Sequence, residues 1–494
     1  MILLKELTVL IAIPILVATG LLGISNSYWN YSVQTKTELI QPNTQPMDLK
    51  EFDISEKSFL YLKRILNEKI DKNKIEGELE LVQQEFERDY LLALLYKRWG
   101  KFDESFNLLF SLLHKKPEYL NFYEELASLG KITGKLDRIL NSINNEDSSN
   151  FFNIYLRGLV YYKKGETAWT IKTFQVLTEN GFVSKEIFYQ LSYALRTTGD
   201  YEKSFSALIR AEELCAREDP FLAKIINLRG TLFYLSGDYE QAKTEYSSAL
   251  NIAKENQNLT EEIKSIANLA IIKDLYGEVD DARIDFIKAI SMAKEIENKG
   301  LLAFLFSELG VSFTYTNNLI EARENYQKSY ELYGLLKNSE RMSYLSSNIG
   351  SIYLQISNYR SALKYYKEGL KFAGENKLGQ ILNLTGIADV YANGSNYSKA
   401  LNYYDRAKQI ADSIKDISSS VKIEEGIGSL FYNINRPLRS IEMFKEAESK
   451  INPEEMPFEM INLYSKLGTV LTSIDSLKLA EDYFLKAIEL AERT

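Results

Sequence analysis

Small and large apolar positions recur in a fixed order along most of the chain. The order is clearest in GTLFYLSGDYEQAKTEY from Gly230, GVSFTYTNNLIEARENY from Gly310 and GSIYLQISNYRSALKYY from Gly350. Each segment has a small residue, then aromatic residues, a polar turn, and a small residue with a large apolar residue four positions later. Residues four positions apart lie on one face of a helix. The pattern therefore predicts two helices joined by a short turn, repeated many times.

Aligning the chain on this pattern gives eleven units. The first small position of each unit is occupied by Ala93, Ala127, Gly158, Ser192, Gly230, Ala270, Gly310, Gly350, Ala388, Gly428 and Gly468. Sixteen residues later the large apolar position is occupied by Leu109, Ile143, Phe174, Leu208, Tyr246, Phe286, Tyr326, Tyr366, Tyr404, Phe444 and Phe484. A small residue lets the two helices of a unit pack closely, because a larger side chain would hold their axes apart.

This pattern resembles the tetratricopeptide repeat, a helix-turn-helix unit of about 34 residues. The resemblance covers about residues 86–494 and implies an all-α fold, a superhelical solenoid of stacked hairpins. The spacing between units rises from 31–34 to 38–40 residues, which predicts longer helices from Phe188 onward. We divide the array into N-terminal units at 85–150 and a main array at 151–494, with a hinge or a sub-domain break at the polar run Asn141–Asn150.

An uncharged apolar segment, Leu7–Ile24, lies near the start of the chain. As a helix its residues would span about 27 Å, close to the thickness of the hydrocarbon core of a bilayer. Residues 1–30 are therefore predicted to be either a transmembrane signal-anchor or a cleavable signal peptide. Tyr28, Trp29 and Tyr31 follow the segment and favour the anchor, since aromatic rings gather at the membrane interface.

Both interpretations deliver the rest of the chain to the same side of the membrane. The distribution of Lys and Arg around the segment places the N-terminus inside the cell. We therefore expect a membrane-anchored protein whose array lies on the extracytoplasmic, periplasmic side. Between the anchor and the array, 31–55 is predicted to be a linker and 56–84 a helical lead-in.

Composition and charge exclude several classes of function. The net charge is −9, with 59 Lys and Arg against 68 Asp and Glu, which argues against general nucleic-acid binding. One cysteine, Cys215, and one histidine, His114, exclude an intramolecular disulfide and a Cys/His zinc site. The chain carries no phosphate-binding loop, dinucleotide motif or nucleophile elbow. We expect neither enzymatic activity nor a bound cofactor or metal.

The resemblance also implies a binding face. In tetratricopeptide-repeat proteins the first helix of each unit lines the inner face of the superhelix, through its second, fifth, ninth and twelfth positions. In units three to five these positions are rich in aromatic residues, and we predict a partner-binding groove formed by Tyr155, Tyr162, Tyr189, Tyr193, Arg196, Asn227 and Tyr234. Tyrosine offers a large contact area and a polar tip, and Arg196 and Asn227 can bind a carboxylate or a peptide backbone.

Other features of the sequence bear on the predicted groove. The chain contains 33 tyrosines, so the alternative is that some of the predicted groove residues pack internally. Farther along the chain the same positions become rich in hydroxyl groups, as at Ser429, Ser465 and Thr469. The Lys and Asn pair with which some members of the family clamp a terminal carboxylate is missing here.

The last predicted helix carries apolar residues around its core positions. Leu479, Tyr483, Leu485 and Ile488 are predicted to form a docking end for a partner or a second copy of the chain. The alternative is a final helix that tolerates exposure or is covered by Lys486 and Arg493.

Two functions remain open. The first is a membrane-tethered scaffold for protein–protein interaction that assembles an envelope complex, such as a flagellar motor collar, a pilus or secretion apparatus, or envelope-biogenesis machinery. The second is a regulatory, peptide-sensing protein that acts through a partner output protein, since long-helix arrays resemble those of signalling regulators. In both cases the partners are proteins or peptide segments.

Overall fold

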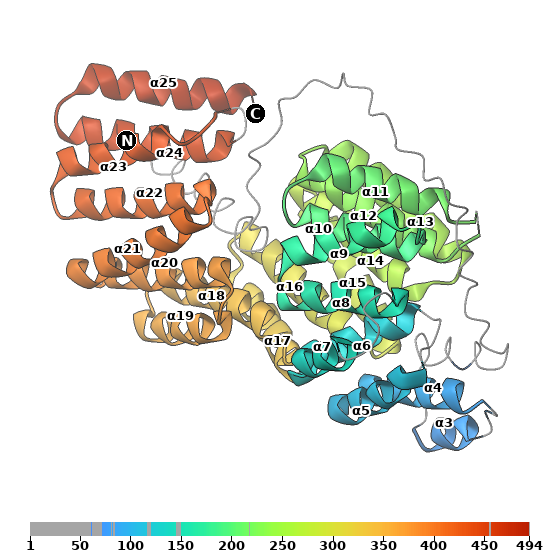
Figure 1. Ribbon diagram of the computed structural model, residues 1–494. Helices are drawn as coiled ribbons and strands as arrows, with labels where there is room; N and C mark the ends of the chain where they lie inside the picture. Colours follow the sequence, from blue (N-terminus) through green and yellow to red (C-terminus); the bar gives the residue numbers. More distant parts are fainter. Residues whose placement is uncertain are drawn as a thin grey trace. The chain divides into compact units, whose positions relative to one another are not determined.

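The computed structural model describes residues 61, 72–80, 82, 84–115, 120–144, 150–216, 218–453 and 456–493, and the regular structure in them is helical (Figure 1). The first helices are α3 (Lys72–Leu79), α4 (Glu85–Arg98), α5 (Phe102–Leu112), the short 3-10 helix η1 (Leu113–Lys115), α6 (Leu120–Thr133), α7 (Leu136–Asn144), α8 (Phe151–Lys164), α9 (Thr167–Glu179), α10 (Lys185–Arg196) and α11 (Tyr201–Glu213).

The helices that follow are longer, with the exception of the 12-residue α23. They are α12 (Phe221–Leu235), α13 (Tyr239–Glu255), α14 (Leu259–Leu275), α15 (Val279–Glu295), α16 (Lys299–Tyr315), α17 (Leu319–Leu335), α18 (Ser339–Gln355), α19 (Tyr359–Ala373), α20 (Lys377–Asn393), α21 (Tyr397–Ser413), α22 (Ile417–Asn433), α23 (Pro437–Glu448), α24 (Pro457–Ser473) and α25 (Leu477–Arg493). The pairs from α4/α5 to α24/α25 correspond to the predicted units.

The predicted contact between small and large residues is present in the pairs that carry glycine. A methyl group added to Gly158 would lie 2.9 Å from the ring of Phe174, and one added to Gly350 would lie 3.0 Å from the ring of Tyr366. Tyr366 also faces Gly386 of the next pair, where an added carbon would lie 2.1 Å from the ring. The aromatic ring of the second helix therefore fills the space that the glycine hydrogen leaves.

Short turns between the later helices follow one chemical rule. Most of these helices are followed within two residues by a residue with positive φ, such as Ser357 at 58° or Ser395 at 59°. The next residue is often Asn or Asp, and its side chain accepts a hydrogen bond from the backbone of the following helix, as Asn358 does from Ser361 at 3.1 Å. This arrangement combines a left-handed C-terminal cap with an N-cap, so each turn satisfies backbone groups of both helices.

The prediction of longer helices from Phe188 onward needs correction. Phe188 lies in α10, which has 12 residues, and α11 has 13. The first helix of 17 residues is α13, and the extra residues of the fourth unit lie between α11 and α12. Spacing alone cannot distinguish a longer helix from a longer connection.

The described residues divide into two compact units. The N-terminal unit extends to Leu305 and includes Leu335–Lys337, and the C-terminal unit holds Phe306–Gly334 and the chain from Asn338 onward. A continuous apolar cluster in the N-terminal unit runs from Tyr61 to Ala207. It includes Ile143, which lies within the predicted hinge, and Phe151, which directly follows it. Residues 145–149 of the hinge lie outside the described residues.

The predicted signal-anchor or signal peptide at 1–30 and the linker at 31–55 lie outside the described residues. Of the predicted lead-in at 56–84, the structure describes α3 and a few neighbouring residues. Within the part of the chain that is described, none of the helices combines the length and the apolar character needed to cross a membrane.

Candidate functional site

Four aromatic rings form a continuous line across α8, α10 and α12. Tyr162 meets Tyr193 edge to face with 5.5 Å between ring centroids. Tyr193 lies 6.3 Å from Tyr189, and Tyr189 meets Phe221 edge to face at 5.4 Å. All four side chains are half-buried, so part of each ring is open to solvent. We call Tyr162, Tyr189, Tyr193 and Phe221 the aromatic surface.

Three cations lie over the faces of these rings. The Arg196 guanidinium is 4.4 Å from the centroid of Tyr193. The Lys224 ammonium is 4.4 Å from the centroid of Tyr189 and 4.7 Å from that of Phe221. Lys163 lies over Tyr162 at 5.4 Å, and burial lowers its pKa. Because the ring faces attract the cations, the aromatic surface also carries positive charge beside its apolar rings.

The Arg196 guanidinium has a donor that makes no hydrogen bond within the described residues. Its Nε is buried and has no hydrogen-bond partner among the described residues. Those residues also provide no carboxylate within ion-pair distance of it. A guanidinium that stacks on Tyr193 with an unused donor is suited to bind a carboxylate or a carbonyl oxygen.

A single carboxylate connects the helices that carry the aromatic surface. Glu124 of α6 accepts hydrogen bonds from the Tyr155 hydroxyl of α8 at 3.1 Å and from Gln190 of α10 at 3.0 Å. It also lies 3.8 Å from the ammonium of Lys224 on α12. Side chains of four first helices therefore converge on the inner face, and this carboxylate holds their relative positions.

Tyr155 does not belong to the accessible surface. It is 0% exposed, and burial together with the nearby Glu124 carboxylate raises its pKa well above the usual value. The predicted groove therefore loses this residue. Its position in the unit points inward, but the neighbouring first helices approach closely enough to cover it.

Asn227 is also removed from the predicted groove, because it is only 6% exposed. Its amide donates to Glu261 at 3.1 Å and to the Ser265 hydroxyl at 3.0 Å, joining α12 to α14. Burial favours the neutral form of Glu261, but Lys264 at 2.6 Å and the Asn227 amide hold the pKa of this carboxyl below its usual range. Asn227 is thus a buried structural residue.

Tyr234 is half-buried but lies apart from the line of rings. It packs against Tyr239 of its own helix pair, with 5.6 Å between centroids. The predicted set therefore separates into Tyr162, Tyr189, Tyr193 and Arg196, which the structure brings together, and Tyr155, Asn227 and Tyr234, which it places elsewhere.

Prediction from sequence missed Phe221, Lys224, Glu124 and Gln190. Lys224 and Glu124 occupy the second and fifth positions of their units, so the repeat pattern already places them on the inner face. Phe221 lies just before the aligned start of its unit, and Gln190 lies beside Tyr189. Neither of these two has a signal in the repeat pattern.

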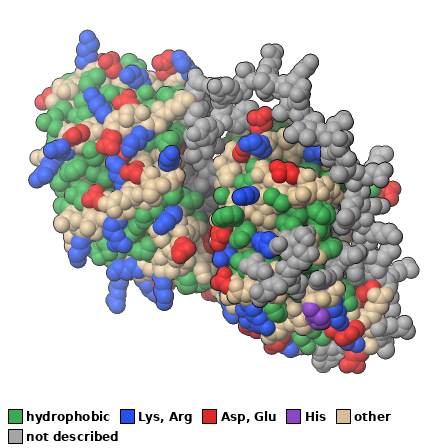
Figure 2. Space-filling view, in the orientation of Figure 1, with side chains coloured by type: hydrophobic (Ala, Val, Ile, Leu, Met, Phe, Trp, Pro, Cys, Tyr) green, Lys and Arg blue, Asp and Glu red, His purple; other side chains and the backbone are tan. Residues whose placement is uncertain are grey.

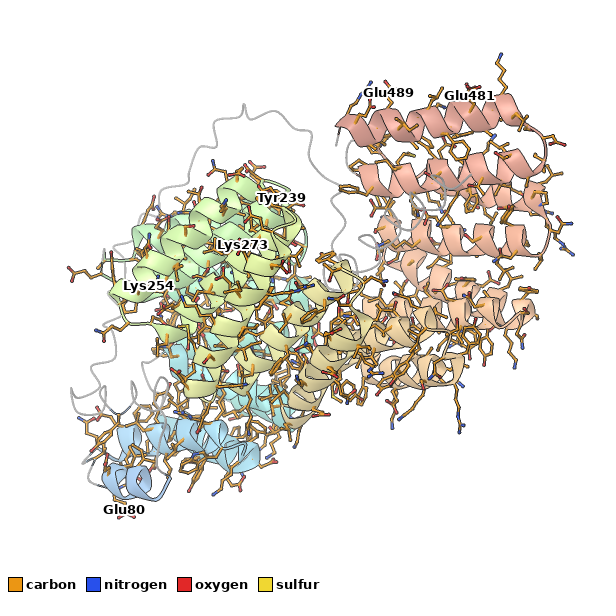
Figure 3. The ribbon with its side chains drawn as sticks, turned by 180° about the vertical axis from the view of Figure 1, so that it is seen from behind. Glu80, Tyr239, Lys254, Lys273, Glu481 and Glu489 are labelled. Carbon is orange, nitrogen blue, oxygen red and sulfur yellow. The ribbon has the colours of Figure 1, made fainter. Side chains whose placement is uncertain are left out.

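The predicted docking end on α25 is partly exposed. Leu479, Leu485 and Ile488 are 43%, 57% and 53% exposed. Tyr483 is buried, packs against Tyr464 at 5.6 Å and donates to Glu448 at 3.3 Å, so it is not part of an exposed face. Figure 3 shows Glu481 and Glu489 projecting from the side of α25 that faces away from α24, so carboxylates also line this helix.

The inner face of the C-terminal unit has different chemistry. The hydroxyl groups of Ser429, Ser465 and Thr469 each donate to the backbone carbonyl four residues earlier, at 2.8–2.9 Å. Asp389 accepts a hydrogen bond from the Tyr404 hydroxyl, and burial raises its pKa to about 6. These polar groups are largely satisfied within the chain.

Comparison with known proteins agrees with the repeat pattern. A model of the tetratricopeptide repeat family matches residues 185–217 and 346–376. The first match covers α10 and α11, and the second covers the end of α18 and all of α19. No match was found among curated protein sequences.

Two solved structures are similar to the chain. A tetratricopeptide repeat protein from Parabacteroides merdae is 17% identical, covers 54% of this chain and 93% of its own, and has a TM-score of 0.41. The apo form of RapI is 17% identical, covers 62% of this chain and 97% of its own, and has a TM-score of 0.35.

The family matches coincide with helix pairs in both units. Their spacing and the packing of aromatic rings against small residues are those expected of the repeat. The chain therefore contains tetratricopeptide repeats, matched at residues 185–217 and 346–376.

Proposed function

We propose that this chain is an interaction protein that captures a segment of a partner protein on the aromatic surface. The observation that carries the proposal is the line of four half-exposed rings, which crosses three successive helix pairs without interruption. Tyrosine and phenylalanine provide large contact area and lose little rotamer entropy on binding. Such rings are typical anchors of protein interfaces.

The surrounding charges suggest what the captured segment carries. Arg196 and Lys224 flank Tyr193, Tyr189 and Phe221 with positive charge. A segment with an apolar residue for the rings and a carboxylate or carbonyl oxygen for Arg196 satisfies both kinds of contact.

We further propose that the chain is a membrane-tethered scaffold that assembles an envelope complex on the extracytoplasmic side. This finer proposal rests on the apolar segment Leu7–Ile24 and on the length of the repeat array. The alternative is a peptide-sensing regulator that acts through a partner output protein. A reporter fused after Thr494 separates them in part, because activity restricted to the cytoplasm contradicts the envelope scaffold.

The proposed binding surface is tested by quantitative capture. The intact chain is crosslinked in cells, purified, and its partners are identified by mass spectrometry. The double variant Tyr189→Ala with Tyr193→Ala is compared with the control Ser465→Ala with Thr469→Ala, which alters the inner face of the C-terminal unit.

We expect the tyrosine variant to recover at least tenfold less partner, since interface aromatic residues commonly contribute about 2 kcal/mol or more each. The control should recover the normal amount. Equal recovery by both variants, with both folded, would overturn the assignment. Several subunits of one machine in the captured set support the scaffold, and a single regulator or short peptide supports the sensor.

A further inference from the structure

The outward side of the second helix in each pair follows a regular spacing. From α9 to α25, the second, sixth, ninth and thirteenth residues of these helices point toward solvent, and nearly all are exposed. In α19 these four positions are Arg360, Lys364, Lys367 and Lys371. We call these residues the α19 basic row.

No other second helix from α9 to α25 has a comparable row. In α9, α23 and α25 one of the four positions is Lys, and in α11, α13, α15, α17 and α21 none is Lys or Arg. The chain as a whole is acidic, with a net charge of −9. Four cations on one helix face therefore stand out against the background of the molecule.

The α19 basic row is not neutralised within the described residues. None of its four side chains lies within ion-pair distance of a described carboxylate. On other second helices some exposed cations are paired, as Arg439 is with Glu442 and Arg210 with Glu213, both at 2.7 Å. None of those helices carries four cations at these positions. Like charges three and four residues apart repel each other, and the one carboxylate among them on this helix is Glu368, four residues after Lys364.

The row is one helix wide. On the preceding second helix, α17, the corresponding row includes the carboxylates Glu324 and Glu331, and on α21 it includes Asp405. The helices are neighbours, because Tyr365 of α19 donates to Gln327 of α17 at 3.2 Å and Tyr403 of α21 packs in the cluster of Tyr366. Figure 2 shows blue side chains along the edge of the C-terminal unit where Figure 1 places α19.

These dimensions indicate the class of anion. The row extends from Arg360 to Lys371, eleven helical rises or about 16 Å. A flat anionic membrane or a nucleic-acid duplex is wider than one helix. It would also meet α17 and α21, where carboxylates are mixed with cations such as Lys328 and Arg406. A single acidic helix lying along α19 would meet the cations alone.

We propose that the α19 basic row is a second docking surface, which binds an acidic helical segment of a partner protein. The carboxylates of that segment recur at the same spacing as the cations, so they form a ladder of ion pairs along one face. The surface is distinct from the aromatic surface, and it lies in the C-terminal unit, so the two can be tested separately.

The test uses the full-length chain and two fluorescent helical peptides of the same length. One peptide carries glutamate at four positions with the spacing of the row, and the other carries glutamine there. Binding is measured by fluorescence anisotropy at low and high ionic strength. The double variant Lys364→Glu with Lys367→Glu is compared with Lys254→Glu with Lys288→Glu, which makes the same change of net charge on exposed lysines of α13 and α15.

We expect the glutamate peptide to bind, with an affinity that falls as salt increases, and the glutamine peptide not to bind. The α19 variant should weaken binding about tenfold, and the control variant less than about twofold. Equal loss in both variants, or equal binding of both peptides, would overturn the proposal. Binding of anionic lipid vesicles that depends on Lys364 and Lys367, without binding of the glutamate peptide, would overturn it in favour of a membrane surface.

Discussion

The inner faces of the two units are built on the same helix pairs but differ in chemistry. In the N-terminal unit the face carries the aromatic surface, with Arg196 and Lys224 stacked on its rings. In the C-terminal unit the corresponding positions carry hydroxyl groups that donate to the backbone of their own helix, as Ser465 and Thr469 do. The first face retains unused contact area and an unused donor on Arg196, whereas the second is largely satisfied internally.

The difference shows how the repeat separates folding from recognition. The contact between a small residue and an aromatic ring is common to both units, as at Gly158 and Phe174 or Gly350 and Tyr366. The inner positions are free to vary because this contact does not involve them. A hydroxyl that donates to its own helix leaves no donor for a partner, while a half-buried tyrosine leaves aromatic area that a partner can contact.

The largest effect is expected from substitutions that disrupt the contact between a small residue and an aromatic ring, which both units share. Gly158→Leu and Gly350→Leu each add a branched side chain where even its Cβ would lie 2.9–3.0 Å from an aromatic ring, closer than van der Waals contact. Each should cost about 3 kcal/mol through overpacking and lower the melting temperature of the chain. Chemical denaturation and thermal melting followed by circular dichroism measure this cost.

A matched glycine gives the control. An added carbon at Gly334, also within a helix, has its nearest neighbour at 3.6 Å, an ordinary contact. Gly334→Ala should therefore leave stability unchanged or raise it slightly, since alanine favours helix. If the leucine variants melt like the unmodified chain, the alignment of the repeats is wrong.

The next effect concerns a charge on the inner face of the C-terminal unit. Burial raises the pKa of Asp389 from 3.8 to about 6, so the folded chain binds a proton there between these pH values and the unfolded chain does not. Stability therefore falls as pH rises from about 4 to 6 and stays lower above 6. Asp389→Asn should remove this loss and stabilise the chain by about 1–3 kcal/mol at pH 7.5.

The measurement is a series of denaturation curves from pH 4 to pH 7.5 for both chains. The asparagine can still accept the hydrogen bond of Tyr404, so packing is preserved. Parallel pH profiles for the variant and the original chain would show that this carboxylate is not the source of the dependence.

A smaller effect is expected from the carboxylate that connects the N-terminal first helices. Glu124→Gln removes the charge opposite Lys224 while retaining an oxygen for Tyr155 and Gln190. We expect a loss of about 1–2 kcal/mol, near the low end for hydrogen bonds to a charged group, because the amide oxygen still accepts. Glu340→Gln, an exposed residue of the C-terminal unit, is the control, and equal effects of the two changes would contradict the connecting role of Glu124.

The smallest effect on stability is expected from the hydroxyl groups on the inner face of the C-terminal unit. Ser465→Ala with Thr469→Ala removes two hydroxyl groups that bond to their own helix. The change in the free energy of unfolding should be within about 0.5 kcal/mol, because these side chains compete weakly with the helix backbone. We call Ser429, Ser465 and Thr469 the hydroxyl face. A large loss measured by denaturation would show that this face contributes to packing.

The packing within helix pairs could be predicted from the sequence, because the separation of sixteen residues between Gly350 and Tyr366 fixes which faces meet. The location of Tyr162, Tyr189 and Tyr193 on neighbouring helices followed from the same alignment. The burial of Tyr155 and Asn227 could not be predicted from the sequence, because it depends on how closely successive first helices approach each other. The Glu124 contacts also join residues up to 100 positions apart, beyond the reach of any local pattern.

The central claim is that a partner binds the aromatic surface rather than the hydroxyl face. The most direct measurement is photo-crosslinking in cells, with a benzophenone amino acid in place of Tyr193 in one version of the chain and in place of Thr469 in another. The account predicts a discrete crosslinked partner from position 193 and none from position 469. A partner crosslinked from position 469 but not from position 193 would contradict it.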